Sequence, residues 1–149
     1  MEKAALKEHR RHSTADKPFS YYISNIPEYF PNAPMHWHKE FELNVILEGE
    51  GDFVTGDIHF TAYKGDIVLT PPDMLHAVYQ HDDKRCVYDT LDLDGSMLGS
   101  RDNDRAADAF IAPLISGAYS IETHITPEHC YYSELLTTAE NMISAAKGD

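Results

Sequence analysis

The stretch MHWHKEFELNVILEGEGDFVTGDIHFTAYKGDIVLTPPDMLHAVYQ, residues 35–80, decides the fold of this chain. Within it, residues 41–47 place an apolar side chain at every second position, which is the period of a β-strand with one apolar face. Gly56-Asp57 separates two further short runs and suits a two-residue hairpin turn. Turn signals at such close spacing predict a sandwich or a barrel.

The β pattern extends on both sides of this stretch and then gives way to helix. Short apolar or alternating runs from residue 19 to residue 93 predict about seven strands, with a loop around Pro27, Pro31 and Pro34 after the first of them. Residues 94–104 read as a loop, and residues 106–115 as a short helix interrupted by Pro113. A longer helix is expected to start at Thr126-Pro127-Glu128. Its apolar stripe, at three- and four-residue spacing, is Leu135, Leu136, Ala139, Met142, Ile143 and Ala146.

The chain of 149 residues is long enough for one domain with a real hydrophobic core. We expect a flexible or conditionally ordered arm over residues 1–17, a barrel over residues 18–95, and a loop and helical segment over residues 96–149. The arm is polar, and its position leads us to expect that it closes over the barrel mouth when a ligand binds. The helical stripe must pack on the barrel wall, on a partner subunit or on a further domain.

Composition limits the class of protein. The formal net charge of −13 would repel phosphates, so we do not expect this chain to bind nucleic acid. No apolar run approaches the roughly 20 residues that cross a bilayer. The N-terminus also lacks the apolar core of a signal peptide. We therefore expect a cytoplasmic protein without membrane contact, in which Cys86 and Cys130 are ordinary thiols.

His36, His38, Glu42 and His76 carry the candidate chemistry. Period-two spacing would place the first three on the same side of one extended strand, and His76 arrives from a second strand. Imidazoles and a carboxylate are ligands for Zn, Ni, Fe or Mn, so the four residues could hold one divalent metal. They could equally line a polar pocket for a small ligand. The ligand-binding set that we predict is His36, His38, Glu42, Asn44, His76 and Gln80.

Three other residues near this set have structural interpretations. Asp92 and Asp94 stand before a glycine, and we interpret them as turn residues rather than as a calcium site. Trp37 lies between two candidate ligands and should face the opposite side of their strand. We expect it to pack under the terminal helix, with a dimer interface as the alternative.

The spacing of the candidate ligands resembles the two motifs of the cupin superfamily. The first motif reads His36-x-His38-x3-Glu42-x6-Gly49, and the second reads Gly65-x5-Pro71-x4-His76. The sequence departs from the superfamily pattern at three positions, where Gly, Gly and Asn are usual and this chain has Phe30, Asp73 and Gln80.

A longer resemblance covers most of the chain. The stretches HWHKEFELNVILEGEGDF, YKGDIVLTPPDMLHAV and FIAPLISGAYSIETHITPEHCYYSELLTTAENMI are similar to the N-terminal effector-binding domain of AraC-type transcriptional regulators. This resemblance implies a cupin barrel that senses a small molecule, often a sugar, and helices that mediate homodimerisation. It also implies a separate C-terminal helix-turn-helix domain that binds DNA. We therefore expect the sensor half of a larger regulator, cut in the linker.

Two other functions stay open. A stand-alone metal-dependent cupin enzyme, a dioxygenase or a sugar isomerase, would use the same ligands, but nothing beside them identifies a general acid, a base or a cosubstrate site. A carbohydrate-binding module would bind sugar without self-association. We expect a non-enzymatic sensor, whose ligand shifts the arm and helices by binding one arrangement better than another.

Overall fold

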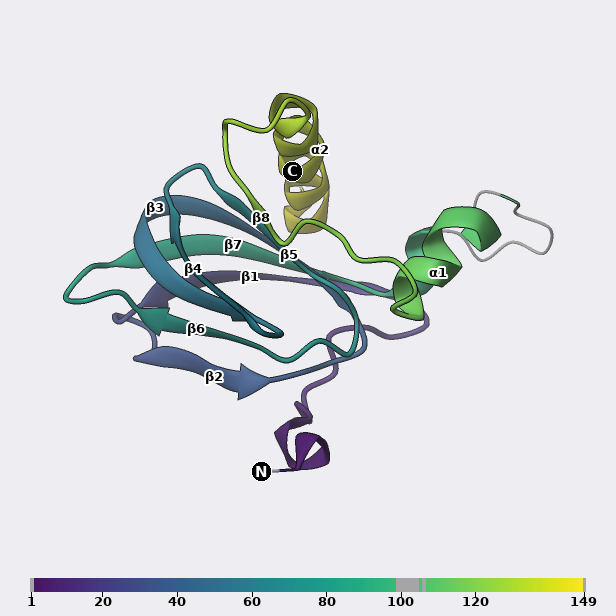
Figure 1. The fold of residues 1–149 in the computed structure, drawn as a ribbon, viewed down its shortest axis with the longest axis horizontal. Coiled ribbons are helices and arrows are strands. Elements are labelled where there is room, and N and C mark those ends of the chain that lie inside the picture. The colour runs from purple at the N-terminus through teal and green to yellow at the C-terminus, as the bar shows by residue number, and fades with distance from the viewer. Residues whose placement is uncertain (1, 99–104, 106, 149) are drawn as a thin grey trace.

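The computed structural model describes residues 2–98, 105 and 107–148, which form a mainly β molecule with helices at its C-terminal end (Figure 1). The strands are β1 (Phe19–Ile26), β2 (Asn32–His36), β3 (Phe41–Thr55), β4 (Ile58–Tyr63), β5 (Ile67–Thr70), β6 (His76–Gln80), β7 (Cys86–Leu93) and β8 (His124–Ile125). The helical segments are η1 (Lys3–Leu6), η2 (Gly95–Leu98), η3 (Ala107–Ile111), α1 (Ala112–Ile115) and α2 (Tyr132–Lys147). The predicted fold class, a mainly β barrel followed by helices, is confirmed.

Two sheet layers share strand β3. One layer has the order β1-β7-β3-β5-β8. In the other layer, β6 lies between β2 and β3, and β4 pairs with β3. The first half of β3 pairs with β5 and β7, and its second half pairs with β4 and β6. The long strand therefore bends from one layer into the other, which closes the barrel.

The bend in β3 depends on Gly49. The register with β7 shifts between Ile46 and Glu48, and Gly49 has a φ of 74°, in the left-handed region that favours glycine. A Cβ atom at this position would lie 1.7 Å from the carbonyl oxygen of Arg85. No other residue fits there without moving the backbone, which gives a physical reason for the glycine that ends the first motif.

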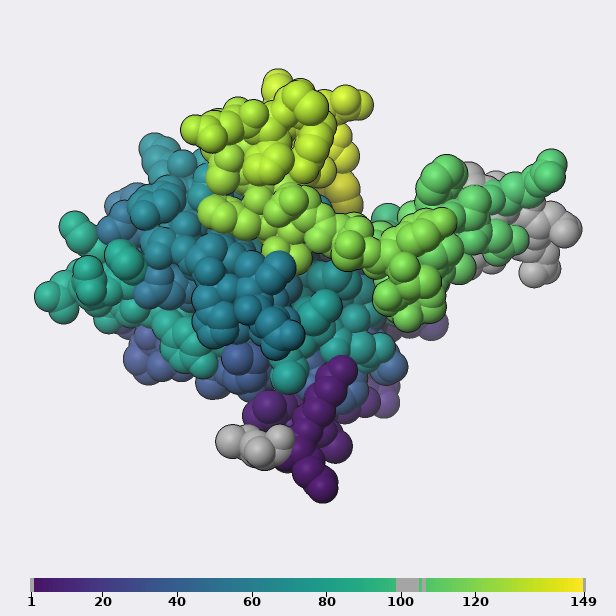
Figure 2. Space-filling view, viewed as in Figure 1, coloured from purple at the N-terminus to yellow at the C-terminus, as the bar shows by residue number. Residues whose placement is uncertain are grey.

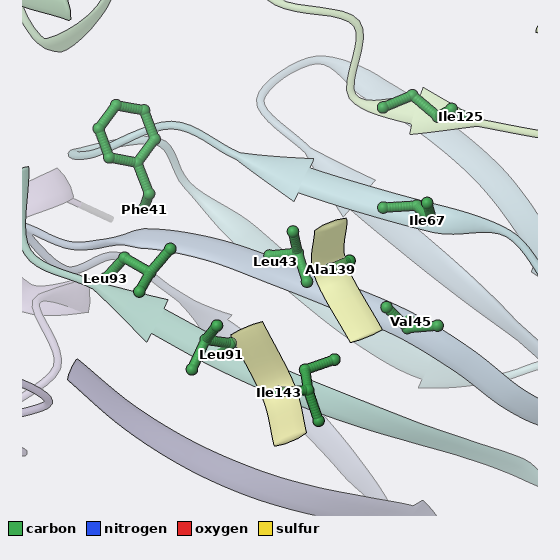
Figure 3. Packing of buried hydrophobic residues seen from close by; sticks show 9 residues of the cluster. All are labelled: Phe41, Leu43, Val45, Ile67, Leu91, Leu93, Ile125, Ala139 and Ile143. Atoms are coloured by element: carbon green, nitrogen blue, oxygen red, sulfur yellow. The ribbon is translucent and has the colours of Figure 1, made fainter. Parts of the chain in front are cut away.

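Helix α2 covers the outer face of the layer that contains β1, β7, β3 and β5 (Figure 3). Phe41, Leu43 and Val45 point outward from β3 and belong to the same buried cluster as Ala139 and Ile143 of α2. All the residues of the predicted stripe lie in or against this cluster: Leu135, Leu136, Ala139, Met142, Ile143 and Ala146. The stripe therefore packs on the wall of its own barrel, where the loss of apolar surface to water stabilises the fold.

Two local predictions were wrong. Helix α2 begins at Tyr132 instead of at Thr126-Pro127-Glu128. The Thr126 N–H donates to Nδ1 of His129 (3.0 Å) and the His129 N–H donates to the Thr126 carbonyl (3.1 Å), so this stretch closes a turn. The proline-rich segment expected to be a loop also contains β2. Pro34 is tolerated there because β2 pairs on one side only, with β6.

The segment after the barrel follows the expected pattern where the structure describes it. The helix expected over residues 106–115 is present as η3 followed by α1, with Pro113 in the first turn of α1; residue 106 lies outside the described residues. Residues 95–98 of the expected loop form η2, and residues 99–104 lie outside the described part of the chain. Among the described helices, none is long and apolar enough to cross a membrane.

The N-terminal arm, described over residues 2–17, lies against the barrel on the side opposite α2 (Figures 1 and 2). Lys7 forms a parallel bridge with Trp37, just after β2. His12, further along the arm, is 6% exposed. The two ends of the chain thus cover different parts of the barrel.

Candidate metal and ligand site

The four predicted metal ligands converge where β2, β3 and β6 meet. His36 is the last residue of β2, and it pairs with His76, the first residue of β6. His38 lies between β2 and β3, and Glu42 lies at the start of β3. One ligand atom from each residue lies within 4.8 Å of the others. The structure therefore places all four side chains around one small space.

The expected route to this arrangement was wrong, because the first three ligands do not lie on one extended strand. β2 ends at His36, and the chain bends before β3 begins at Phe41. The Asp73 N–H donates to the carbonyl oxygen of His38 (2.8 Å) and holds this bend. The bend carries the chain from one sheet layer to the other, and His38 and Glu42 still face the same interior space.

Backbone carbonyl groups fix the orientation of two of the imidazole rings. Nδ1 of His36 lies 2.8 Å from the Pro34 carbonyl oxygen, and Nδ1 of His76 lies 2.9 Å from the Met74 carbonyl oxygen. A carbonyl oxygen can only accept, so each Nδ1 carries a proton and donates it. This leaves Nε2 of both rings as the ligand atom, in the arrangement found around protein-bound metals.

His76 gives the clearest sign that something binds here. The residue is 3% exposed, yet its Nε2 has no hydrogen-bond partner among the described residues. The nearest carboxylate oxygen, Oε2 of Glu42, lies 3.4 Å away without hydrogen-bond geometry. Buried polar atoms are nearly always satisfied in folded proteins, so an unpartnered one at the centre of three other ligand groups fits a bound cation.

Glu42 is held in place as a charged carboxylate. Its Oε2 lies 3.3 Å from Nε2 of His38, and its Oε1 accepts a hydrogen bond from Nδ2 of Asn44 (2.7 Å). Asn44 in turn accepts a hydrogen bond from the Thr90 hydroxyl (2.6 Å). Burial would raise the pKa of Glu42, but the nearby His76 and His38 rings hold that pKa well below its usual range.

The two histidines at the ends of β2 and β6 differ in their charge preference. Burial and the neighbouring His76 lower the pKa of His36, so this ring is a neutral ligand near neutral pH. Burial also opposes a charge on His76, but the Glu42 carboxylate outweighs it and raises the pKa of His76. A metal ion would have to displace the proton that Glu42 favours on His76, so metal binding should release protons.

The donor set fits a divalent metal. Three imidazole nitrogens and one carboxylate oxygen are good ligands for borderline transition metals, and two of the rings already present Nε2 with the correct proton on Nδ1. The site is therefore a candidate His/Glu metal centre.

A cavity of about 500 Å³ lies beside the ligand set. Its lining comes from the arm, from strands β1, β2, β3, β6 and β7, and from Phe30 between β1 and β2. Aromatic and apolar walls are formed by Tyr22, Phe30, Val78 and Tyr88, and polar groups by Ser24, Asn32, Thr90 and Asp92. This volume suits a small molecule, and the mixture of apolar walls and a few convergent polar groups is typical of ligand sites.

Of the predicted ligand-binding residues, His36, Glu42 and His76 line the cavity, whereas His38, Asn44 and Gln80 do not. Asn44 is 1% exposed and acts behind Glu42, which it orients, without lining the cavity. Gln80 lies at the far end of β6, where its side-chain amide donates to the Lys84 carbonyl oxygen (3.1 Å). Gln80 and His76 lie on the same face of β6. Gln80 is nevertheless distant from the site, because β6 runs away from it.

We expected the arm to close over the barrel mouth, but sequence reasoning missed the arm residues that reach this site. Glu8, Arg10 and His12 line the cavity. Nδ1 of His12 lies 2.6 Å from Oδ2 of Asp92, and its Nε2 lies 3.0 Å from Oε2 of Glu8. Burial would lower the pKa of His12, but these two carboxylates raise it to about 11. A lone histidine in a polar arm carries no periodic signal, so only the folded arrangement reveals its role.

Asp92 was wrongly interpreted as a turn residue. It lies inside β7, is 1% exposed and shares the interior face of that strand with Tyr88 and Thr90. The alternation along β7 is the signal that could have identified it. The turn interpretation holds for Asp94, whose carboxylate accepts a hydrogen bond from the Ser96 N–H (2.9 Å).

Trp37 packs against the arm and not under the terminal helix, which corrects the expectation for this residue. Its indole N–H donates to the Lys3 carbonyl oxygen (2.8 Å). The ammonium groups of Lys3 and Lys7 each lie 5.4 Å from the centre of the indole ring, within cation–π range. The side chain faces away from the ligand set, as its position between two ligands predicted, but α2 covers a different face of the barrel.

The fold of this chain is similar to that of a solved cupin protein. A cupin protein from Bacteroides fragilis has a TM-score of 0.50 at 18% identity, over 57% of this chain and 73% of that one. A predicted oxalate decarboxylase from Thermotoga maritima has a TM-score of 0.47 at 20% identity, over 62% of this chain and 74% of that one. These likenesses concern the fold and not activity.

Sequence comparison gives the family of the chain. The AraC-like ligand binding domain matches residues 28–105, more than half of the chain, so the chain belongs to that family. The uncharacterized HTH-type transcriptional regulator YdeC of Bacillus subtilis is 27% identical over 89 residues, which are 59% of this chain and 31% of that protein. The chain thus spans about a third of the length of this curated relative. The predicted resemblance to AraC-type sensors is confirmed.

Proposed function

We propose that this chain senses a small effector for a transcriptional regulator and binds that effector in the cavity beside His36, His38, Glu42 and His76. The observation that carries the proposal is Nε2 of His76, which is buried without a hydrogen-bond partner among the described residues, next to a cavity of about 500 Å³. Membership of the AraC-like ligand binding domain family supports a sensing role for that cavity.

One divalent metal, Zn, Ni, Fe or Mn, is part of the proposed site, held by His36, His38, Glu42 and His76. A bound metal would supply a Lewis-acidic centre for an oxygen atom of the effector. The protein's own groups orient the ligands: the Pro34 and Met74 carbonyls hold two rings, and Asn44 holds the carboxylate. Such supporting contacts commonly tune metal affinity.

A sugar or a related hydroxylated metabolite is the effector class that the cavity lining favours. Ser24, Asn32 and Thr90 offer hydroxyl and amide groups, while Tyr22 and Tyr88 offer aromatic surface. Hydroxylated ligands use both kinds of contact, because their polar edges need hydrogen bonds and their apolar faces pack on rings.

The regulatory output would pass through a helix-turn-helix domain elsewhere in the regulator. Strands β3 and β7 connect the cavity with α2, since Glu42 faces inward while its neighbour Leu43 packs under the helix. A ligand that favours one position of these strands would therefore shift the helix as well. We also propose a homodimer through the C-terminal segment, where Met97 and Phe110 are 47% and 67% exposed.

Replacing His38 and His76 together by Ala tests the proposed site. We expect about one metal equivalent per chain in the native protein and none in the double variant, measured by elemental mass spectrometry. Effector binding, followed by thermal shift with a panel of sugars and polyols, should weaken at least about 10-fold in the same variant. Gln80→Ala is the matched control, because it changes β6 at a distance from the cavity.

Two results would contradict this proposal. Unchanged sugar or polyol binding in the double variant would remove the cavity from the sensing site. Turnover of any bound compound would favour the metal-dependent enzyme that the same ligand set also permits. A metal-free native protein that loses effector binding in the double variant would retain the sensor and reduce the four residues to polar walls of its pocket. Sedimentation equilibrium of the same samples tests the proposed homodimer.

A further inference from the structure

The N-terminal arm pairs with the backbone between two of the candidate metal ligands. The Glu8 N–H donates to the Trp37 carbonyl oxygen (3.0 Å), and the Trp37 N–H donates to the Leu6 carbonyl oxygen (3.1 Å). Trp37 lies between His36 and His38 in the sequence. This pairing therefore sets Glu8 beside the ligand set, although the residues are far apart along the chain.

The Glu8 carboxylate faces the ligand atom of His36. Oε2 of Glu8 lies 3.4 Å from Nε2 of His36, and Glu8 lines the same cavity. Nδ1 of His36 donates its proton to the Pro34 carbonyl, so Nε2 is the atom left to bind a cation. The same oxygen lies 3.0 Å from Nε2 of His12, and a proton or a metal cation between it and the lone pair of His36 would make this close approach favourable.

A second observation points to a cation in the same space. Nε2 of His76 is buried and has no hydrogen-bond partner among the described residues, although Oε2 of Glu42 lies 3.4 Å away. The rings of His36 and His76 have their centres 4.1 Å apart, so the atoms that face Glu8 and Glu42 belong to one cluster. The two carboxylates approach it from different directions, one from β3 and one from the arm.

We propose that Glu8 is a further protein ligand of the metal site formed by His36, His38, Glu42 and His76. This inference rests on the metal site proposed above. The arm then carries one of the ligands, and the site is complete only when the arm is docked on the barrel. Metal binding and arm docking must consequently strengthen each other by the same free energy.

Trypsin can report the state of the arm, because Lys7, Arg10 and Arg11 are exposed and lie on either side of Glu8. Cleavage at these residues requires the arm to leave the barrel, so its rate follows the opening equilibrium. Added Zn²⁺ should therefore slow cleavage in the native protein. The same addition should protect the arm much less once Glu8 no longer binds metal.

Glu8→Gln is the test variant, since the amide can still accept a hydrogen bond from His12 but is a poor metal ligand. We expect its Zn²⁺ affinity, measured by chelator competition, to fall about 10- to 100-fold. The visible spectrum of the Co²⁺-loaded protein should also change, because the spectrum depends on the ligands and geometry around cobalt. Glu2→Gln is the matched control: it removes the same charge from an exposed position of the same arm.

The outcomes separate this inference from the proposed function. Lower Zn²⁺ affinity, an altered Co²⁺ spectrum and lost Zn²⁺ protection in Glu8→Gln, with Glu2→Gln like the native protein, establish Glu8 as a ligand. An unchanged affinity and spectrum in Glu8→Gln overturn the inference but leave the four-residue site intact. A native protein that binds neither ion overturns it too, and the effector experiment with His38 and His76 then decides the proposed function alone.

Discussion

The two ends of the chain cover the barrel by opposite physical means. Helix α2 lies on the outer face and contributes Ala139 and Ile143 to an apolar cluster. The arm lies beside the cavity and is held by polar contacts, among them His12 with Asp92 and the Ser13 hydroxyl with Glu40 (2.6 Å). Apolar burial is non-directional and insensitive to pH, whereas hydrogen bonds and ion pairs depend on protonation and on competing ligands.

This difference assigns different roles to α2 and to the N-terminal arm. An element held by apolar packing, such as α2, remains in place as long as the domain is folded. An element held by charged groups around a ligand cavity, such as the arm, can be released or stabilised by a ligand or a metal ion that binds in that cavity. We therefore expect changes under α2 to reduce the stability of the whole domain, and changes in the arm to act mostly on the site and on local opening.

The largest expected effect is that of Ile143→Ala under α2. Ile143 is 4% exposed within the outer apolar cluster, and a smaller side chain leaves a cavity there. We expect the free energy of unfolding, measured by urea denaturation, to fall by about 2–5 kcal/mol. Asn141→Ala, at an exposed position of the same helix, should change it by no more than about 0.5 kcal/mol. Equal effects of the two changes would show that α2 is not packed as described.

His12→Ala should have a smaller and pH-dependent effect in metal-free protein. It leaves the buried Asp92 carboxylate without its partner, which should lower the free energy of unfolding by about 1–3 kcal/mol near pH 6. The pKa of His12 is raised from 6.5 to about 11 in the folded state. A raised pKa stabilises the folded state fully below pH 6.5, and this stabilisation is lost as the pH rises toward about 11.

The pH dependence of that difference is the decisive measurement. Urea unfolding of the native protein and of His12→Ala at about pH 6 and about pH 9.5 should give a larger difference at the lower pH. His81→Ala serves as the control, because His81 forms its 2.8 Å pair with Asp52 near the surface, where such pairs contribute about 0–1 kcal/mol. A difference that grows as the pH rises would contradict the assigned role of His12.

The apolar face of α2 could be predicted from the sequence, whereas the arm residues that line the cavity could not. The stripe of α2 and the alternation of residues 41–47 are periodic signals, and periodicity states directly which faces are apolar. The motif spacing likewise identified His36, His38, Glu42 and His76, which the fold brings together. The prediction that His36, His38 and Glu42 share one strand was wrong. The chain bends between β2 and β3, and the side chains still converge.

The contacts of the arm lay beyond sequence reasoning for a physical reason. Glu8 and His12 reach the cavity through tertiary pairing of the arm with Trp37, and no local pattern encodes such a contact. The same limit explains Gln80, which shares the strand face of His76 but lies too far along β6 to reach the site. The period of a strand predicts which side a residue faces. The distance of that residue from the site depends on the direction of the strand in the fold.

Trp37→Phe has the smallest expected effect. It is also the sharpest test of whether the arm leaves the barrel without unfolding of the whole domain. Phenylalanine keeps a ring for Lys3 and Lys7 but removes the indole N–H that donates to the Lys3 carbonyl oxygen. Losing one such bond should ease arm opening by about 0.5–1.5 kcal/mol, which makes tryptic cleavage of the arm about 2- to 12-fold faster. The free energy of global unfolding should change less than the opening free energy, because the arm opens without α2.

Tyr131→Phe provides the control for this last change, since it also removes one polar atom from an aromatic side chain but at an exposed position before α2. It should leave the cleavage rate of the arm unaltered. If Trp37→Phe lowered the midpoint of urea unfolding as much as it opened the arm, the arm would be part of the cooperative fold. The arm would then stay on the barrel as long as the domain is folded, like α2. The contrast between the apolar packing of α2 and the polar contacts of the arm would not hold for this barrel.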